Sequence, residues 1–273
     1  MVNFCEFDPH ATKSYCAIHN TSEDINLGDI TKVDIKSLEE CDFITHGSPC
    51  QDFSISGLQA GGEVDSGTRS SLIWNSVEII RHCKPKFVIW ENVKNVLSDK
   101  HKHNFDKYIN TMDSMGYNSY YEVLCGTDYN IPQIRERIVV VSIRKDIDNG
   151  EFRFVKPTKI NNTFYDFLDE QVDEKYYKQQ FFKSKKKYDN EVFDDLTIYK
   201  LVENKDKISK RNDGNIYTLT ASGRNCGNNQ YIAKLGRVLS PAESLKLMGF
   251  DYSDYEKLRN IGMPETKIYK QAG

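Results

Sequence analysis

The chain has 273 residues and a mass of 31.6 kDa, which is enough for one full catalytic core and a small second domain. A hydrophobic content of 38% and a charged content of 28% suit a soluble protein. No signal-peptide pattern opens the chain, and no apolar run approaches the roughly 20 residues that a membrane helix needs. The net charge of −3 argues mildly against nucleic acid as a partner. It is only an average, and phosphate binding depends on local clusters. Lys183–Lys187 is either such a cluster or a solvated loop.

The seven cysteines form no CxxC pair and no Cys/His spacing typical of a metal site. We therefore expect no metal centre, and a reduced cytoplasmic compartment fits this cysteine usage best.

The first 145 residues alternate expected strands and helices. Such alternation predicts an α/β fold with a parallel sheet flanked by helices. In chain order the expected elements are a strand at 2–5, a helix at 11–18, a strand at 43–44, a helix at 72–83, a strand at 87–90, a helix at 104–115 closed by Gly116, and a strand at 138–143.

From about Lys145 the composition changes to Asn, Lys, Asp and Tyr, and no strong period persists through residue 210. We expect a small, loop-rich domain there, ending near Leu235. Helical patterning returns after Arg237, with Pro241 at a helix start and Glu243 in its first turn. The expected division is a catalytic domain at 1–145, a recognition domain at 146–235 and a segment at 236–273 that returns to the catalytic domain.

Residues 47–54 read Gly-Ser-Pro-Cys-Gln-Asp-Phe-Ser and follow the apolar run at 41–45. A cysteine on a Pro-containing loop at the carboxyl end of a strand is where an α/β enzyme presents a nucleophile. Taken alone, Cys50 is better interpreted as a small buried hydrophobe. Three further segments change this interpretation. They are Trp90-Glu91-Asn92-Val93, Gln133-Ile134-Arg135-Glu136-Arg137, and the run from Arg237 to Glu243.

In this order and spacing, the segments resemble the DNA cytosine-5 methyltransferase family over nearly the whole chain. The resemblance implies a Rossmann-like S-adenosylmethionine-dependent methyltransferase fold with a small target-recognition domain. It also implies methylation of cytosine carbon 5 in a specific double-stranded DNA sequence, in a restriction-modification system or for phage protection. In this family a cysteine thiolate, matched here by Cys50, adds to carbon 6 of a flipped-out base, and carbon 5 then takes the methyl group.

The resemblance assigns further catalytic roles. Glu91 matches the glutamate that protonates or hydrogen-bonds ring N3, and Arg137 matches the arginine that contacts the cytosine carbonyl oxygen. Arg135 belongs to the same motif, where positioning of the loop is its more plausible task, and Asn92 is expected to brace the catalytic loop. The alternatives are a carboxylate at a helix N-terminus for Glu91 and a surface Arg-Glu-Arg ion-pair set for the arginines.

Cofactor and DNA contacts follow from the same resemblance. For S-adenosyl-L-methionine, Glu6 resembles the acid that binds the ribose hydroxyls, Phe7 the ring that stacks on adenine, and Asp29 the acceptor from the adenine amino group. Ile30, Pro49 and Leu72 complete the expected cofactor set. The segment from Ser54 to Arg69 resembles a lid that closes over DNA. The expected DNA or target contacts are Gln51, Ser54, Ser56, Arg69, Thr218 and Leu219.

The sequence departs from the family in two places. It has no Phe-x-Gly-x-Gly loop to hold the methionine end of the cofactor, and 270–273 resembles only the start of the last motif. We therefore expect weak cofactor binding by this chain alone. Either the sequence is a fragment, or a complementing polypeptide supplies both motifs. The alternatives are an inactive or partner-dependent DNA-binding fragment, or an RNA cytosine-5 methyltransferase. The Cys-Phe-Thr signature of the RNA branch is absent.

Overall fold

The computed structural model describes residues 1–49, 69–158, 162–177, 196–200, 209–221 and 230–273. The chain forms two compact units. Unit 1 comprises Met1–Pro9, Ser22–Leu124 and Glu136–Lys156, and unit 2 comprises His10–Thr21, Cys125–Arg135 and Pro157–Gly273. Across the described ranges, no helix has the length and hydropathy required to cross a membrane. The three-part functional division expected from the sequence stays a prediction.

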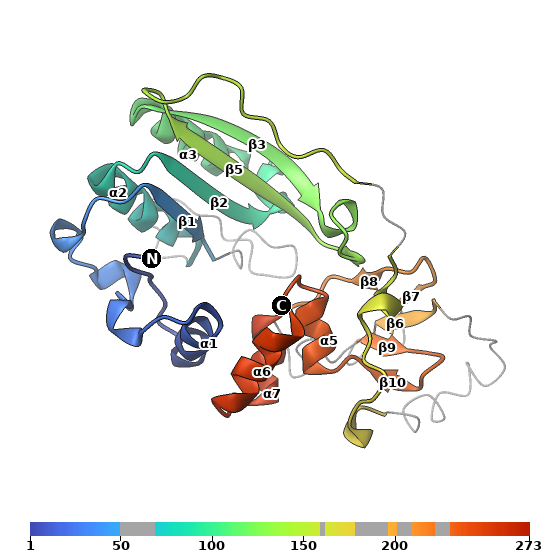
Figure 1. Ribbon diagram of the computed structural model, residues 1–273. Helices are drawn as coiled ribbons and strands as arrows, with labels where there is room; N and C mark the ends of the chain where they lie inside the picture. The colour runs from blue at the N-terminus through green and yellow to red at the C-terminus, as the bar shows by residue number, and fades with distance from the viewer. Residues whose placement is uncertain (50–68, 159–161, 178–195, 201–208, 222–229) are drawn as a thin grey trace. The chain divides into compact units, whose positions relative to one another are not determined.

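Unit 1 contains a four-stranded sheet in the order β1-β2-β5-β3 (Figure 1). The strands are β1 (Phe43–Gly47), β2 (Phe87–Val93), β3 (Tyr117–Cys125) and β5 (Glu136–Arg144). β1 and β2 run parallel, as expected, whereas β2 and β5 run antiparallel. After β3 the chain reverses direction, and β5 inserts between β3 and β2. The sheet therefore contains both parallel and antiparallel strand pairs and is mixed. The α/β fold class is confirmed.

One face of this sheet is covered by α2 (Ile73–Cys83) and α3 (Lys102–Ser114), close to the expected helices. Alternate strand residues supply the core, because successive side chains in a strand point to opposite faces. The core residues are Ile73, Val77, Ile80, Val88, Trp90, Val96, Phe105, Tyr108, Met112, Tyr117, Ile138 and Val140. On the opposite face Phe43 and Phe87 stand beside one another in register and remain 51% and 38% exposed.

The first expected strand is reduced to one β-bridge between Phe4 and Asn26. The Phe4 N–H donates to the Ile25 carbonyl at 3.2 Å, and the Leu27 N–H donates to the Phe4 carbonyl at 2.8 Å. No longer ladder forms here, because the partner segment turns into short 3-10 helices on both sides. These helices are Glu23–Ile25, Ile30–Lys32 and Ile35–Ser37.

Unit 2 holds short strands where the sequence shows no strong period. A four-stranded sheet has the order β10-β9-β6-β7, and β4 pairs in parallel with β8. The strands are β4 (Gln133–Ile134), β6 (Ile198–Lys200), β7 (Ser209–Arg211), β8 (Ile216–Tyr217), β9 (Gln230–Ile232) and β10 (Arg237–Val238). Strands of two or three residues are too short for a pattern of alternation to predict.

The helices of unit 2 are α1 (Pro9–His19), α5 (Pro241–Lys246), α6 (Tyr252–Asn260) and α7 (Glu265–Gln271). Its 3-10 helices include Phe164–Phe167 and Glu174–Tyr176. The start of α5 at Pro241 agrees with the expectation from the sequence. Residues 10–19 of α1 lie in this unit, where Ser14 Oγ donates to Gln271 Oε1 at 2.8 Å and Lys257 Nζ donates to the Ile18 carbonyl at 3.0 Å.

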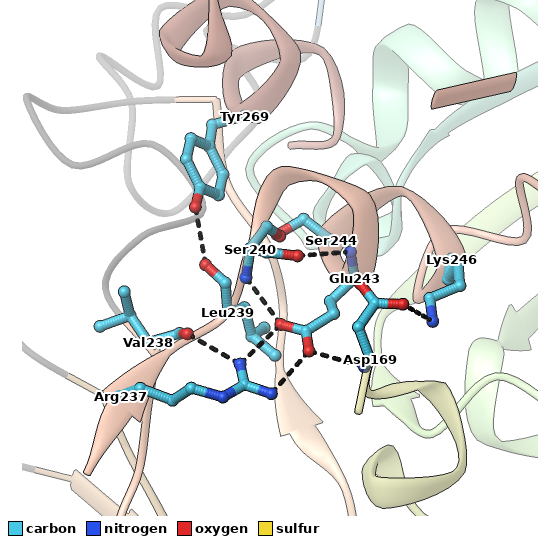
Figure 2. A network of polar contacts seen from close by, with 9 residues as sticks. All are labelled: Asp169, Arg237, Val238, Leu239, Ser240, Glu243, Ser244, Lys246 and Tyr269. Atoms are coloured by element: carbon cyan, nitrogen blue, oxygen red, sulfur yellow. Dashed lines mark hydrogen bonds and ion pairs between the residues drawn. The ribbon is translucent and has the colours of Figure 1, made fainter. Parts of the chain in front are cut away.

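A buried polar network joins β10 to α5 (Figure 2). Arg237 places Nη1 and Nη2 at 2.8 and 2.7 Å from the two carboxylate oxygens of Glu243. Ser240 and Glu243 also form a capping box at the first turn of α5. Asp169 donates its backbone N–H to Glu243 Oε1 at 2.9 Å, so the loop at Asp169 is attached to the same carboxylate.

Candidate active site

Glu91 and Arg137 form an ion pair in unit 1, with Arg137 Nε 2.9 Å from Glu91 Oε1. The arginine side chain is 20% exposed and the glutamate 48% exposed, so the pair is open to solvent on the carboxylate side. Arg137 Nη1 also donates to the backbone carbonyl of Glu136 at 2.8 Å. The structure therefore brings together two of the residues that the sequence predicts as catalytic.

The sheet register explains this meeting. Val93 of β2 lies opposite Arg137 of β5, which puts Glu91 and Arg137 two positions apart on adjacent strands. Residues at this diagonal are within reach of long side chains. On the other side Gly47 lies opposite Glu91, and a Cβ added to Gly47 would stand 3.7 Å from Glu91 Oε2. The Glu91 carboxylate thus lies beside the start of the Gly47–Ser54 segment.

Cys50, Gln51, Ser54 and Ser56 lie outside the described residues, as does most of the expected lid. The described residues on either side of 50–68 are Pro49 and Arg69. Pro49 is half-buried, and Arg69 begins the 3-10 helix Arg69–Leu72. Leu72, expected at the cofactor, is the half-buried N-cap residue of α2.

A histidine that the sequence pattern did not single out lies at the end of β1. The ring of His46 is stacked against Trp90, with centroids 6.4 Å apart, and His46 Nε2 is 3.2 Å from the Tyr108 hydroxyl. His46 Nδ1 is buried and has no hydrogen-bond partner. Removal from water lowers the pKa of His46 to about 4, so the ring is neutral at pH 7. Its position four residues before Cys50 is the sequence feature from which a place near the cysteine loop could have been predicted.

Among the expected cofactor residues of the N-terminal segment, Glu6 forms hydrogen bonds within the protein. The backbone of Glu6 is tied to the Asn26 side chain by two hydrogen bonds of 3.0 and 2.9 Å. Its carboxylate accepts from the Asp8 N–H at 2.8 Å, which fixes one oxygen, Oε1. The neighbouring Phe7 ring is 81% exposed, so one or both of its faces are open to a planar ligand.

Asp29 caps the 3-10 helix that Ile30 begins. Its Oδ1 accepts from the Thr31 N–H at 3.0 Å and from the Thr31 hydroxyl at 2.8 Å. These two donors, the backbone one first, hold the pKa of Asp29 below its usual range. Ile30 is half-buried. Asp29 is therefore ionised and has its second oxygen, Oδ2, 3.6 Å from Lys32 Nζ.

The first three residues of the Gln-Ile-Arg-Glu-Arg motif, 133–135, belong to unit 2 and hold the Thr218–Leu219 segment. Gln133 Oε1 accepts from the Leu219 N–H at 3.0 Å, and Arg135 Nη1 donates to the Leu219 carbonyl at 3.0 Å. Thr218 Oγ1 donates to the carbonyl of Ile134. Arg135 also donates through Nη2 to the Gly273 carbonyl at 3.2 Å. Arg135 thus contacts the Leu219 and Gly273 carbonyls, and its expected role in positioning a loop or contacting phosphate stays a prediction.

Comparisons with known proteins agree with these motifs. The sequence profile described as "C-5 cytosine-specific DNA methylase" matches residues 1–273. Type II methyltransferase M2.ScrFI of Lactococcus lactis subsp. cremoris is 37% identical over 255 residues, covering 91% of this chain and 66% of that protein. Type II methyltransferase M.SsoII of Shigella sonnei is 32% identical over 278 residues, covering 98% of this chain and 68% of that protein.

The fold is also similar to solved structures. The crystal structure of the S. pombe Dnmt2 methyltransferase matches with a TM-score of 0.65 at 18% identity, covering 100% of this chain and 86% of that one. At this identity the likeness concerns the fold. The chain spans about two thirds of the length of M2.ScrFI, at 66%. From the profile match over its whole length, the chain belongs to the C-5 cytosine-specific DNA methylase family.

Proposed function

We propose that the chain methylates carbon 5 of cytosine in a specific double-stranded DNA sequence, with S-adenosyl-L-methionine as methyl donor and Cys50 as nucleophile. The observation that carries the proposal is the Glu91–Arg137 pair beside Gly47, three residues before Cys50. An acid and a fixed guanidinium at the start of the cysteine loop are what cytosine activation requires.

In the absence of a bound cytosine, Glu91 and Arg137 form an ion pair with each other. The edge of a flipped-out cytosine offers N3 beside the carbonyl oxygen, which is a pair of groups that a carboxyl and a guanidinium can bind side by side. In this proposal Glu91 holds or supplies a proton at N3, and Arg137 donates to the carbonyl oxygen. Both interactions draw electron density from the ring as the Cys50 thiolate adds to carbon 6. Their partial exposure permits this exchange of partners.

The N-terminal residues fit the adenosine part of the cofactor. Phe7 has an open ring for adenine, and Glu6 and Asp29 are carboxylates within the segments that meet at the Phe4–Asn26 bridge. When bound, S-adenosyl-L-methionine supplies an electrophilic methyl group on a sulfonium. Ile30, Pro49 and Leu72 would line the same site.

We also propose that a complementing polypeptide with a Phe-x-Gly-x-Gly segment completes this site. Among the described strands, β1 pairs with β2 alone, so no described strand occupies its other edge, where a strand can add by main-chain hydrogen bonds. Phe43 and Phe87 form an exposed apolar pair on the sheet face away from α2 and α3. Adjacent exposed aromatic rings of this kind favour a covering segment. A strand followed by a glycine-rich loop would fill the edge and supply donors to the cofactor.

Calorimetric titration of S-adenosylmethionine tests the complementing polypeptide. The chain alone should bind roughly tenfold more weakly than the mixture with a polypeptide carrying the first and last motifs, a difference of about 1.4 kcal/mol. Equal affinity in both titrations would contradict the proposal.

The names of the relatives support a restriction-modification role, since M2.ScrFI and M.SsoII are type II methyltransferases. We propose the cytoplasm as the compartment, where a reduced Cys50 and the DNA are both available. The remaining residues proposed to contact DNA are Gln51, Ser54, Ser56, Arg69, Thr218 and Leu219.

The test of the whole proposal is Cys50→Ser. Methyl transfer from labelled cofactor to duplex DNA should disappear in the reconstituted enzyme while DNA affinity is retained, because a serine hydroxyl does not ionise near neutral pH. RNA of the same sequence is the second substrate in the assay. A mutant that keeps more than a tenth of the activity, roughly 1.4 kcal/mol of barrier, would remove Cys50 from the nucleophile role. DNA binding by the wild-type mixture without turnover would favour a binding fragment.

A further inference from the structure

Ser48 is held by two side chains of β2. The indole Nε1–H of Trp90 donates to Ser48 Oγ at 3.3 Å. The side-chain amide of Asn92 donates to the same oxygen at 2.8 Å and to the Ser48 carbonyl at 3.2 Å. All three residues are buried, with 9% of Ser48 and 1% each of Trp90 and Asn92 exposed. We call this arrangement the Ser48 clamp.

The clamp uses the acceptor capacity of Ser48 in full. A hydroxyl oxygen has two acceptor lone pairs, and one donor from Trp90 and one from Asn92 occupy them. The indole has a single N–H, so loss of the Ser48 hydroxyl would leave that donor buried and unpaired. Asn92 is itself fixed, because its Oδ1 accepts from the Val93 N–H at 2.8 Å. All of these hydrogen bonds lie within unit 1.

The clamp connects the cysteine loop to the strand that carries Glu91. Trp90 and Asn92 flank Glu91 in β2, and side chains alternate along a strand. The two flanking residues therefore grip Ser48 on one face while Glu91 meets Arg137 on the other. Between Ser48 and Cys50 stands only Pro49, whose ring fixes its own φ and restricts the residue before it. The clamp therefore holds the residue that lies two positions before Cys50 in the sequence.

We infer that Ser48 and Trp90 are positioning residues, which set where Cys50 stands relative to Glu91 and Arg137. The expected effect of the clamp on methyl transfer rests on the proposed function. The hydrogen bonds of the clamp do not depend on it. The clamp acts through geometry, because a misplacement of about 1 Å at a reacting group can cost on the order of 100-fold in rate.

Two variants remove hydrogen bonds of the Ser48 clamp, and Ser48→Ala does so with the smaller change in side-chain volume. Trp90→Phe keeps a stacked ring against Phe105 and His46 but removes the indole N–H. Ser48→Ala removes the acceptor of both donors. Tyr117→Phe is the control, because it removes another buried donor of the same core, a hydroxyl that donates to the Pro85 carbonyl at 2.7 Å.

The first measurement is amide exchange in the chain alone, which requires no turnover. Exchange at Gly47, Ser48 and Cys50 should accelerate about tenfold or more in Ser48→Ala and Trp90→Phe, as expected for a loss of at least 1.4 kcal/mol of local stability. Peptides from α6, which lies in unit 2, should exchange as in the wild type, and Tyr117→Phe should leave the cysteine loop unchanged. Unchanged exchange in both clamp variants would overturn the inference. If Ser48→Ala accelerates exchange everywhere, Trp90→Phe decides the question.

The second measurement is single-turnover methyl transfer by the reconstituted enzyme. Both clamp variants should lower the transfer rate about 10- to 100-fold at saturating DNA and cofactor, while the DNA Kd stays within about twofold. A wild-type rate in both variants would overturn the positioning role. Absence of transfer by the wild type, with loop exchange still accelerated in the variants, would refute the proposed function and leave the clamp standing.

Discussion

Arg237 and Glu243 form an ion pair from which water is excluded, with 2% and 0% of their side chains exposed and 2.7 Å between Nη2 and Oε1. Glu243 Oε2 also accepts from the Ser240 N–H at 2.7 Å, and Oε1 accepts from the Asp169 N–H. Each charge is thus compensated by its partner and by surrounding donors or acceptors (Figure 2). The pair fixes β10, the first turn of α5 and the loop at Asp169 to one another.

Glu243→Gln should therefore destabilise unit 2 strongly, because it leaves the guanidinium of Arg237 buried without its counter-charge. We expect a loss of about 3–5 kcal/mol in the free energy of unfolding, measured in urea. Lys246→Ala is the control. It removes an ion pair with Asp169 whose side chains are 21% and 22% exposed, and should cost no more than about 1 kcal/mol. Equal losses in the two variants would contradict this account of the network.

The sequence predicted Glu243 only as an acidic residue in the first turn of a helix. The capping box agrees with that prediction. The pairing with Arg237 was not predicted, because it depends on how β10 enters α5 and no local period encodes that. The same limit applies to Gln133, whose side-chain amide accepts from the Leu219 N–H and donates to the Leu247 carbonyl, both far away in the sequence.

The helices of unit 1 and the strands β1, β2 and β5 were predicted from their helical periods and apolar runs. Strand β3 was missed, because its residues do not alternate between buried and exposed positions. The antiparallel return of β5 was not predicted, since a buried strand reads the same in either direction.

Of the candidate site, Glu91 and Arg137 form an ion pair, and their catalytic roles stay a prediction. Asn92 was expected to brace the catalytic loop, and its side chain does hold Ser48. The contribution of Trp90 to this clamp and the contacts of His46 were missed, because no local sequence pattern encodes a buried polar contact between separate strands and helices.

Glu91→Gln should reduce single-turnover methyl transfer by about 10²–10⁴-fold, the usual effect of losing a general acid. An amide can still hydrogen-bond a ring nitrogen, but it does not supply a proton. Glu136→Gln is the matched control, because Glu136 lies next to Arg137 in β5 and pairs with Lys94 at 2.8 Å in solvent. A transfer rate in Glu91→Gln equal to that of the control would leave Glu91 with a structural role alone.

Phe7→Ala should weaken cofactor binding without changing the melting temperature. The ring is 81% exposed, so little packing is lost on truncation. If the ring stacks on adenine, the cofactor Kd should rise by about 5- to 100-fold, corresponding to the 1–3 kcal/mol typical of stacking on a base. Val155→Ala removes another exposed apolar side chain, 75% exposed, and should leave the Kd unchanged. Titration of the reconstituted enzyme measures both values.

The last prediction concerns pH and His46. Burial lowers the pKa of His46 from 6.5 to about 4 in the folded chain, so between these values the unfolded chain binds more protons than the folded one. His46 should therefore reduce stability as the pH falls from about 6.5 towards 4, and contribute no pH dependence above that window. Tyr108, its hydrogen-bond partner, stays neutral because burial raises its pKa. Trp90 does not titrate.

His46→Gln should flatten the loss of stability between pH 7 and 5 relative to the wild type, because the glutamine has no proton to take up on unfolding. The measured quantity is the difference between the unfolding free energies of the wild type and the variant at each pH. Carboxylates titrate in both proteins, so their contribution to the pH dependence drops out of this difference. His82→Gln, at an exposed position in the last turn of α2, is the control and should follow the wild type. Parallel pH profiles for the wild type and His46→Gln would mean that the His46 ring takes up its proton as readily in the fold as in the unfolded chain.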